Sequence, residues 1–120
     1  MNEIFKKLDG IGAETGDALE RFMDDEEMYL KYVRSFPDEP TMKALVKAVE
    51  EKDYTAAEKA VHALKGIVNN LGFLPLADAS VDMLEELRDG NIEDALEAYE
   101  DVTEQYGIFS EVIKEWRSRE

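Results

Sequence analysis

Apolar residues recur three and four positions apart along most of this 120-residue chain. The longest stripe of this kind runs from Ile92 to Trp116, and a second one runs from Leu76 to Leu87. This spacing places apolar side chains on one face of an α-helix, and no segment shows the strict alternation of a half-buried strand. The pattern therefore predicts an all-α protein.

Glycine, proline and capping residues divide the pattern into separate helices. Pro40 and Pro75 suit the first turn of a helix, and Gly72 suits the position just after its end. The expected N-terminal caps are Asp24 or Asp25, Asp53 or Thr55, and Asn91. The expected helices cover about 2–8, 17–23, 25–36, 40–52, 54–71, 75–88 and 92–118, with a glycine-rich loop at 9–17.

Helices joined by short loops bury their apolar stripes most simply as an antiparallel four-helix bundle. A chain of this length is large enough for one hydrophobic core and small for two. We therefore expect a single domain over residues 1–120, with the core bundle at about 25–118. Short additional N-terminal helices would form a cap over residues 1–24.

The chain is strongly acidic, with 29 Asp and Glu residues against 14 Lys and Arg residues and a formal net charge of −15. Such an excess repels nucleic acids and anionic membrane surfaces, so we expect neither as a partner. The chain has no cysteine, and it has no apolar segment typical of a signal peptide or a membrane span. We expect a cytoplasmic monomer that holds no metal ion.

The only histidine of the chain, His62, lies on the helix expected over residues 54–71. On a helical wheel of about 100° per residue, His62 falls opposite the centre of the apolar arc and therefore points outward. The arc, which we expect to face the core, consists of Ala57, Ala60, Val61, Leu64, Ile67, Val68 and Leu71. The outward neighbours of His62 at helical spacing are Glu58, Lys65, Gly66 and Asn69.

Two features distinguish this histidine from an ordinary surface residue. Gly66 interrupts a strong helix at a cost of about 1 kcal/mol relative to Ala, and its missing side chain leaves room for another molecule beside His62. Lys59 and Lys65 flank the ring and give this helix a net charge of +1, whereas residues 73–104 carry eleven acidic residues against Arg88 alone. Such surroundings suit an imidazole that gains an anionic phosphoryl group.

The stretch HALKGIVNNLG resembles the signature of histidine-containing phosphotransfer (HPt) domains, and also that of the phospho-accepting domain of chemotaxis-type histidine kinases. The matching residues are His62, Leu64, Lys65, Gly66, Asn70 and Gly72. The resemblance extends weakly upstream through ALERFMDDEEMYLKYVRSF and downstream through LADASVDMLEEL. The family fold, a four-helix bundle with an extra N-terminal helix, agrees with the periodicity. Ile67 and Val68 stand where the family more often has small residues, and both lie toward the expected core.

The resemblance implies that His62 is phosphorylated, that Lys65 stabilises the phosphoryl group and that Gly66 clears space for a partner. Asn69, Lys59 and Glu58 would complete the docking face. The expected partners are response-regulator receiver domains, with a hybrid histidine kinase as a further candidate. We expect Mg²⁺ on the receiver and no cofactor on this chain.

We therefore expect a phosphorelay carrier that takes a phosphoryl group from a receiver aspartyl phosphate onto His62 and passes it to another receiver. It would be a substrate and carrier and not an enzyme. The start at Met1 favours a freestanding protein. Two alternatives stay open, namely the phospho-accepting domain of a chemotaxis-type kinase and a helical adaptor that binds receivers without being phosphorylated.

Overall fold

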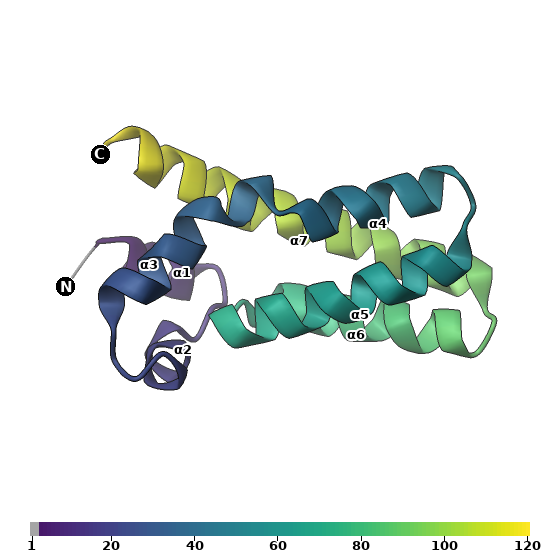
Figure 1. The fold of residues 1–120 in the computed structure, drawn as a ribbon, viewed down its shortest axis with the longest axis horizontal. Coiled ribbons are helices and arrows are strands. Elements are labelled where there is room, and N and C mark those ends of the chain that lie inside the picture. The colour runs from purple at the N-terminus through teal and green to yellow at the C-terminus, as the bar shows by residue number, and fades with distance from the viewer. Residues whose placement is uncertain (1–2) are drawn as a thin grey trace.

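The computed structural model describes residues 3–120, which form seven α-helices and one short 3-10 helix without any strand (Figure 1). The helices are α1 (Glu3–Gly10), α2 (Thr15–Arg21), α3 (Glu26–Ser35), η1 (Phe36–Asp38), α4 (Pro40–Glu50), α5 (Tyr54–Leu71), α6 (Leu74–Arg88) and α7 (Ile92–Ser118). The all-α prediction is confirmed. The predicted first helical residue, Asn2, lies outside the described residues.

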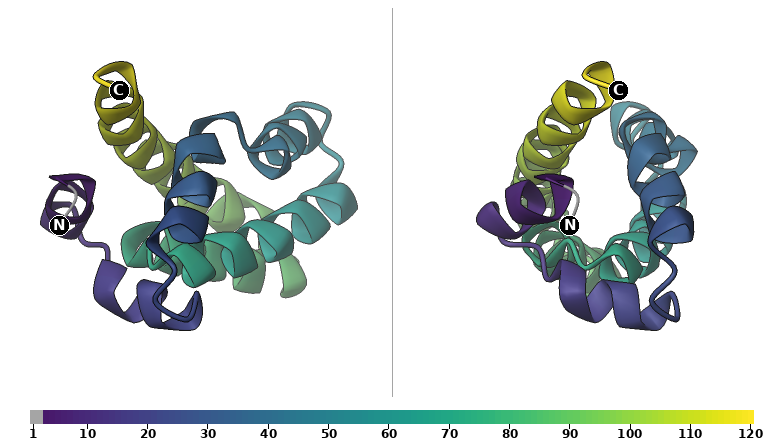
Figure 2. Two further views of the ribbon diagram at one scale, coloured as in Figure 1. Left: turned by 60° about the vertical axis from the view of Figure 1, so that its left-hand side comes forward. Right: turned by 90° about the vertical axis from the view of Figure 1, so that its left-hand side faces the viewer.

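The long helices pack in chain order, α4 against α5, α5 against α6 and α6 against α7. Helix α3 and η1 continue the line of α4 and close the bundle against α7 (Figure 1). Helix α1 packs against α7 and α2 against α5, so the two short N-terminal helices cover one end of the bundle (Figure 2). This is the predicted helical bundle with additional N-terminal helices. Each helix within residues 3–120 is either too short or too polar to span a lipid bilayer.

The structure decides between the alternative helix caps. The carboxylate of Asp25 accepts a hydrogen bond from the Met28 N–H at 3.1 Å and caps α3. The carboxylate of Asp53 accepts one from the Ala56 N–H, also at 3.1 Å, and caps α5. Both bonds satisfy an amide that the first turn of a helix leaves without a partner.

Helix α7 begins at Ile92 as predicted, but its expected side-chain cap and the predicted start of α2 are wrong. Asn91 precedes α7, but its side chain makes no capping hydrogen bond within the described structure. Instead the Asn91 N–H donates to the Glu86 carbonyl at 2.9 Å, which orders the turn through the backbone. Helix α2 begins at Thr15, two residues before the predicted start, because the Asp9 carboxylate accepts hydrogen bonds from the Thr15 N–H (3.0 Å) and hydroxyl (2.8 Å).

Three aromatic rings fix the region where α5 ends. Phe73, just after α5, stacks on Phe109 of α7 with ring centroids 4.5 Å apart. Phe36 of η1 meets Phe73 edge to face at 5.1 Å. All three rings are buried, and such pairs stabilise a core by about 0.5–1.5 kcal/mol each beyond the burial of their area. They hold the C-terminal end of α5 between η1 and α7.

Candidate functional site

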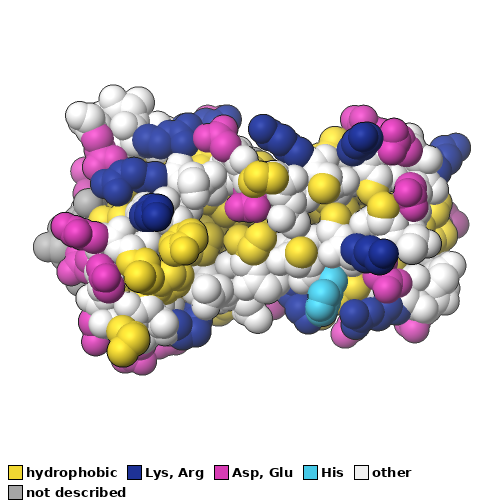
Figure 3. Space-filling model, viewed as in Figure 1, with side chains coloured by type: hydrophobic (Ala, Val, Ile, Leu, Met, Phe, Trp, Pro, Cys, Tyr) yellow, Lys and Arg dark blue, Asp and Glu magenta, His cyan; other side chains and the backbone are white. Residues whose placement is uncertain are grey.

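His62 lies near the middle of α5, with its side chain exposed to solvent (Figure 3). Val61, Leu64 and Val68 on the opposite face are fully buried. The outward orientation predicted from the helical wheel is therefore confirmed. None of the hydrogen bonds and ion pairs within residues 3–120 uses the imidazole ring, so neither ring nitrogen has a partner in the described structure.

The predicted core arc of α5 is too wide at its edges. Ala60 and Ile67 are half-buried, whereas the sequence pattern places both in the core. Ile67 stands at the border between the buried face and the outer face of α5, where no other helix covers it fully. Ile67 thus adds apolar surface beside the His62 face.

The other predicted site residues share the outer face of α5 with His62. Lys59, Gly66 and Asn69 are exposed, and Glu58 and Lys65 are half-buried. Lys and Arg side chains lie on both sides of the histidine in the space-filling view (Figure 3). No ion pair within residues 3–120 uses Glu58, Lys59 or Lys65, so both lysine charges are free to meet an external anion.

Gly66 faces open space. A Cβ atom at this position would have no neighbour within 4 Å among the described residues. The packing of the chain therefore does not require a glycine here, although glycine weakens a helix interior by about 1 kcal/mol relative to Ala. The missing side chain matters only for a molecule that approaches α5 from outside, one turn from His62.

Gly72 has a different role, at the C-terminal end of α5. Its backbone adopts φ +81°, a left-handed conformation that ends α5 and that residues with a Cβ rarely adopt. A Cβ here would lie 2.6 Å from the Glu14 carbonyl oxygen. The Glu14 N–H in turn donates to the Gly72 carbonyl at 2.9 Å. Gly72 thus lets the segment before α2 dock on the end of α5.

The last four carbonyls of α5, which no residue within the helix can satisfy, all accept hydrogen bonds from other parts of the chain. The donors are the Phe73 N–H to Val68 (2.9 Å), the Arg21 guanidinium to Asn69 (2.6 Å) and Asn70 (3.1 Å), and the Tyr29 hydroxyl to Leu71 (2.7 Å). The positive charge of Arg21 also suits the negative end of the helix dipole. Arg21 and Tyr29 thus fasten α2 and α3 to the helix that carries His62.

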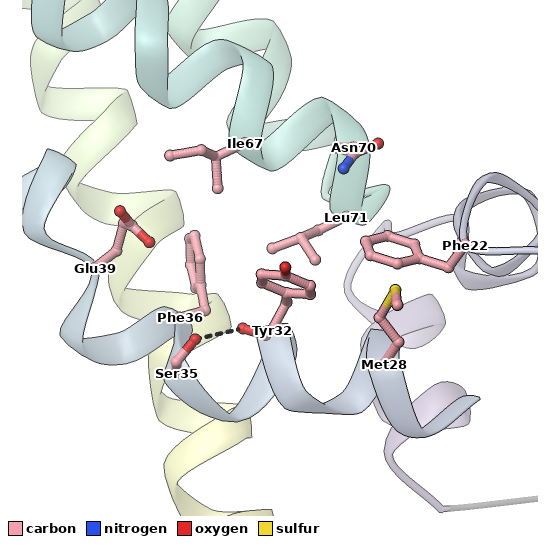
Figure 4. A pocket seen from close by; sticks show the side chains of 9 residues that line it. All are labelled: Phe22, Met28, Tyr32, Ser35, Phe36, Glu39, Ile67, Asn70 and Leu71. Carbon is pink, nitrogen blue, oxygen red and sulfur yellow. Dashed lines mark hydrogen bonds between the residues drawn. The ribbon is translucent and has the colours of Figure 1, made fainter. Parts of the chain in front are cut away.

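Two adjoining hollows lie beside the His62 face. One, of about 600 Å³, lies over Gly66 and Ala63 and extends to Arg21. The other, of about 280 Å³, lies between α3 and α5 and is lined mainly by apolar side chains, among them Phe22, Met28, Tyr32 and Leu71 (Figure 4). Ile67 and Asn70 line both hollows. These two residues therefore lie between the hollow over Gly66 and the hollow beside α3.

The residues that α2 and α3 contribute to these hollows were not predicted from the sequence. A sequence signal for Met28 and Tyr32 exists, because they lie four positions apart and beside the buried arc of Tyr29 and Val33. The apolar arc of α3 is therefore wider than its contact with the core requires. Arg21 has no comparable signal, since its partners are 48 and 49 residues away in the chain.

Within residues 3–120, no group of three or more Asp, Glu or His side chains lies close enough together to hold a metal ion.

The chain matches the model of one known protein family. The family model described as Hpt domain matches residues 17–115, while no curated protein and no solved structure matches the chain significantly. The matched region begins in α2 and ends in α7, so it contains the His62 face, both glycines of the motif and Arg21, and it leaves out α1. Since the match covers most of the chain and includes an exposed histidine on a helical bundle, this protein belongs to the Hpt domain family.

Proposed function

We propose that this protein is a phosphorelay carrier, in which His62 accepts a phosphoryl group from the aspartyl phosphate of a receiver domain and gives it to another receiver. The observation that carries the proposal is the exposed imidazole of His62, free of internal partners, one turn from the open space at Gly66. Membership of the Hpt family supports a phosphotransfer role for a histidine. In this proposal the relay operates in the cytoplasm.

The transfer step needs little from this chain beyond a free ring nitrogen. One unprotonated nitrogen of His62 attacks the phosphorus of the aspartyl phosphate, and a nitrogen–phosphorus bond forms. The bond from phosphorus to the aspartate oxygen breaks, and the aspartate leaves as a carboxylate. Because this leaving group is a weak base, it takes no proton, and positioning and charge neutralisation dominate the rate.

The residues around His62 suit the positioning of a receiver and the neutralisation of phosphoryl charge. Lys65, one turn along α5, is close enough in sequence to pair with phosphoryl oxygens on His62. Lys59 and Asn69 lie on the same exposed face, where a docked receiver would contact them. In this proposal the receiver brings the Mg²⁺ ion, and this chain remains a substrate and carrier.

The test is a labelling experiment. The protein is mixed with a panel of phosphorylated receiver domains and Mg²⁺, and the product is examined for a phosphoryl group that is labile in acid and stable in base. We expect such a group on the wild type and none on His62→Gln. Lys65→Gln should keep the label but lose it faster by hydrolysis, and Lys114→Gln on α7, which is exposed and far along the chain, serves as its control.

The same experiment separates the alternatives. Labelling by ATP and a histidine kinase domain, without labelling by any receiver, would favour the phospho-accepting domain of a kinase. Receiver binding that persists in His62→Gln while neither source ever labels the wild type would favour an adaptor and contradict the relay proposal.

A further inference from the structure

A separate cavity of about 320 Å³ lies between α1, α2 and α3, at the end of the bundle that the short N-terminal helices cover (Figure 2). It shares no lining residue with the two hollows beside the His62 face. Its volume falls within the range in which proteins bind small organic molecules. The residues that line it are Phe5, Asp9, Thr15, Gly16, Leu19 and Glu26.

Part of the cavity wall is apolar and held in place by the core. Phe5 is buried, and its ring stacks on that of Tyr29 with centroids 5.9 Å apart. Leu19 is half-buried and packs against the same core. Gly16 contributes no side chain, and a Cβ atom there would have no neighbour within 4 Å among the described residues. The cavity therefore offers a fixed apolar surface with open space beside it.

Two carboxylates from different helices border this apolar surface. Oδ1 of Asp9 accepts hydrogen bonds from the Thr15 N–H (3.0 Å) and hydroxyl (2.8 Å), which fix the carboxylate in position. No hydrogen bond or ion pair within residues 3–120 uses Oδ2 of Asp9 or either carboxylate oxygen of the exposed Glu26. A cation can therefore contact both carboxylates without displacing an internal partner.

The charge around the cavity determines which class of ligand suits it. Residues 9–27 contain eight acidic side chains against Arg21 alone, a net charge of −7. Arg21 does not line the cavity, because its guanidinium donates to the Asn69 and Asn70 carbonyls at the end of α5. Such surroundings repel anions and attract cations, and an apolar surface adds affinity for a cation that carries an apolar body.

We propose that this cavity binds a small organic cation, with its apolar body on Phe5 and Leu19 and its protonated amine between the carboxylates of Asp9 and Glu26. The site does not depend on the proposed relay, because no residue of α5 lines it. Four of its six lining residues precede residue 17, where the match to the Hpt domain model begins. Most of the site therefore lies outside the part of the chain that the family model matches.

The position of the cavity indicates what an occupant does to the protein. A ligand that contacts α1, α2 and α3 together binds only while these helices are assembled, so it stabilises the native state. Helix α2 also carries Arg21, which holds the end of α5. Occupancy should therefore raise the midpoint of thermal unfolding, and it should do so equally in His62→Gln, in which no relay operates.

The test uses phenethylamine as the probe, because at pH 7 it combines a protonated amine with one aromatic ring. The isotope-labelled protein is titrated with it and followed by the amide chemical shifts in NMR spectra. We expect saturable shifts at Phe5, Gly16 and Leu19, with a Kd of about 1 mM or lower. Phenethyl alcohol, which has the ring without the charge, and ethylamine, which has the charge without the ring, should each bind at least about threefold more weakly.

Two variants and a matched control locate the site. Glu26→Gln removes a charge at the cavity and should raise the Kd at least about threefold, whereas Glu27→Gln, its exposed neighbour that does not line the cavity, should leave the Kd within about 1.5-fold. Gly16→Leu places a side chain in the open space and should raise the Kd about tenfold or more. Because Leu has a higher helix propensity than Gly, the thermal stability of Gly16→Leu should not fall.

The outcomes separate this site from a general attraction of cations to an acidic protein. Equal Kd values for Glu26→Gln and Glu27→Gln, or a wild-type Kd in Gly16→Leu, would overturn the cavity as the site. Phenethyl alcohol that binds as tightly as phenethylamine would overturn the assignment of a cation. Cavity binding that persists in His62→Gln, while no receiver labels the wild type, would support this site and refute only the relay.

Discussion

The two glycines of the HALKGIVNNLG stretch have opposite structural roles. Gly66 lies in a helix interior with nothing near its missing side chain, whereas Gly72 has a left-handed backbone, and a Cβ there would lie 2.6 Å from the Glu14 carbonyl oxygen. The sequence interpretation of Gly66 as open space is consistent with the structure. The role of Gly72 in docking the segment before α2 was not predictable, because Glu14 lies 58 positions away in the chain.

This difference predicts opposite effects on stability. Gly66→Ala should raise the free energy of unfolding by about 0.5–1 kcal/mol, because Ala has the higher helix propensity and its Cβ would clash with no other atom. Gly72→Ala should lower it by about 2 kcal/mol or more, because the Cβ meets a backbone oxygen at 2.6 Å and the φ is unfavourable. Urea unfolding monitored by circular dichroism measures both changes.

A larger side chain at position 66 tests whether Gly66 clears space for a receiver. Gly66→Leu should keep the stability of Gly66→Ala but slow transfer between His62 and a receiver, because the side chain occupies the space beside the imidazole. A Gly66→Leu variant that transfers at the wild-type rate would contradict the clearance role of this glycine.

At the scale of elements, helix periodicity and capping residues predicted α5 to its terminal residues. The signals for this helix are local. Asp53 is a capping residue just before Tyr54, and Gly72 suits the left-handed turn at the other end. Such signals are sufficient when a helix lies between two short loops. What the sequence did not reveal is how the end of α5 is held. Arg21 and Tyr29 reach its carbonyls from other helices, and such long-range contacts leave no periodic pattern.

The hydroxyl of Tyr29 allows a test of this attachment. Tyr29→Phe leaves the Leu71 carbonyl without its side-chain donor in a buried site, which should lower the free energy of unfolding by about 1–2 kcal/mol at pH 8. The ring contacts with Phe5 and Phe22 should persist, so the helical content should not change. Tyr32→Phe, which alters an exposed hydroxyl, is the matched control and should change stability by less than about 0.5 kcal/mol.

The pH dependence of the free energy of unfolding gives a second test of the buried Tyr29 hydroxyl. Burial, with a smaller contribution from the charge of Asp9, raises the pKa of the Tyr29 phenol far above its ordinary value. In the unfolded chain a tyrosine ionises near pH 10, so the native state loses stability relative to the unfolded state as the pH rises above about 10. Tyr29→Phe cannot ionise here and should lose less stability between pH 8 and pH 11 than the wild type. Equal losses in the two proteins would mean that other groups cause the alkaline sensitivity, such as the half-buried Tyr106, whose pKa is also raised by its partial burial.

At the scale of the whole molecule, the excess of acidic residues dominates the electrostatics. The charge of −15 is spread over a small bundle, and the ion pairs of the described structure lie at its surface, where each contributes little. Composition sets the sign of the long-range field, and the sequence also shows that the lysines near His62 stand out against it. What only the fold shows is that the carboxylates from Asp24 to Glu27 lie at the end of the bundle where α2 and α3 contact α5.

Salt should therefore stabilise this protein. Raising NaCl from about 10 mM to 300 mM shortens the screening length from about 30 Å to less than 10 Å and weakens the repulsion among carboxylates, which is stronger in the compact state than in the expanded unfolded chain. The same salt weakens the surface ion pairs, but these involve few of the 29 acidic residues. We expect a gain on the order of 1 kcal/mol, or about 4 °C in the midpoint of thermal unfolding. Sucrose at the same osmolality controls for general solvent effects, and a midpoint that falls with NaCl would mean that the ion pairs outweigh the net charge.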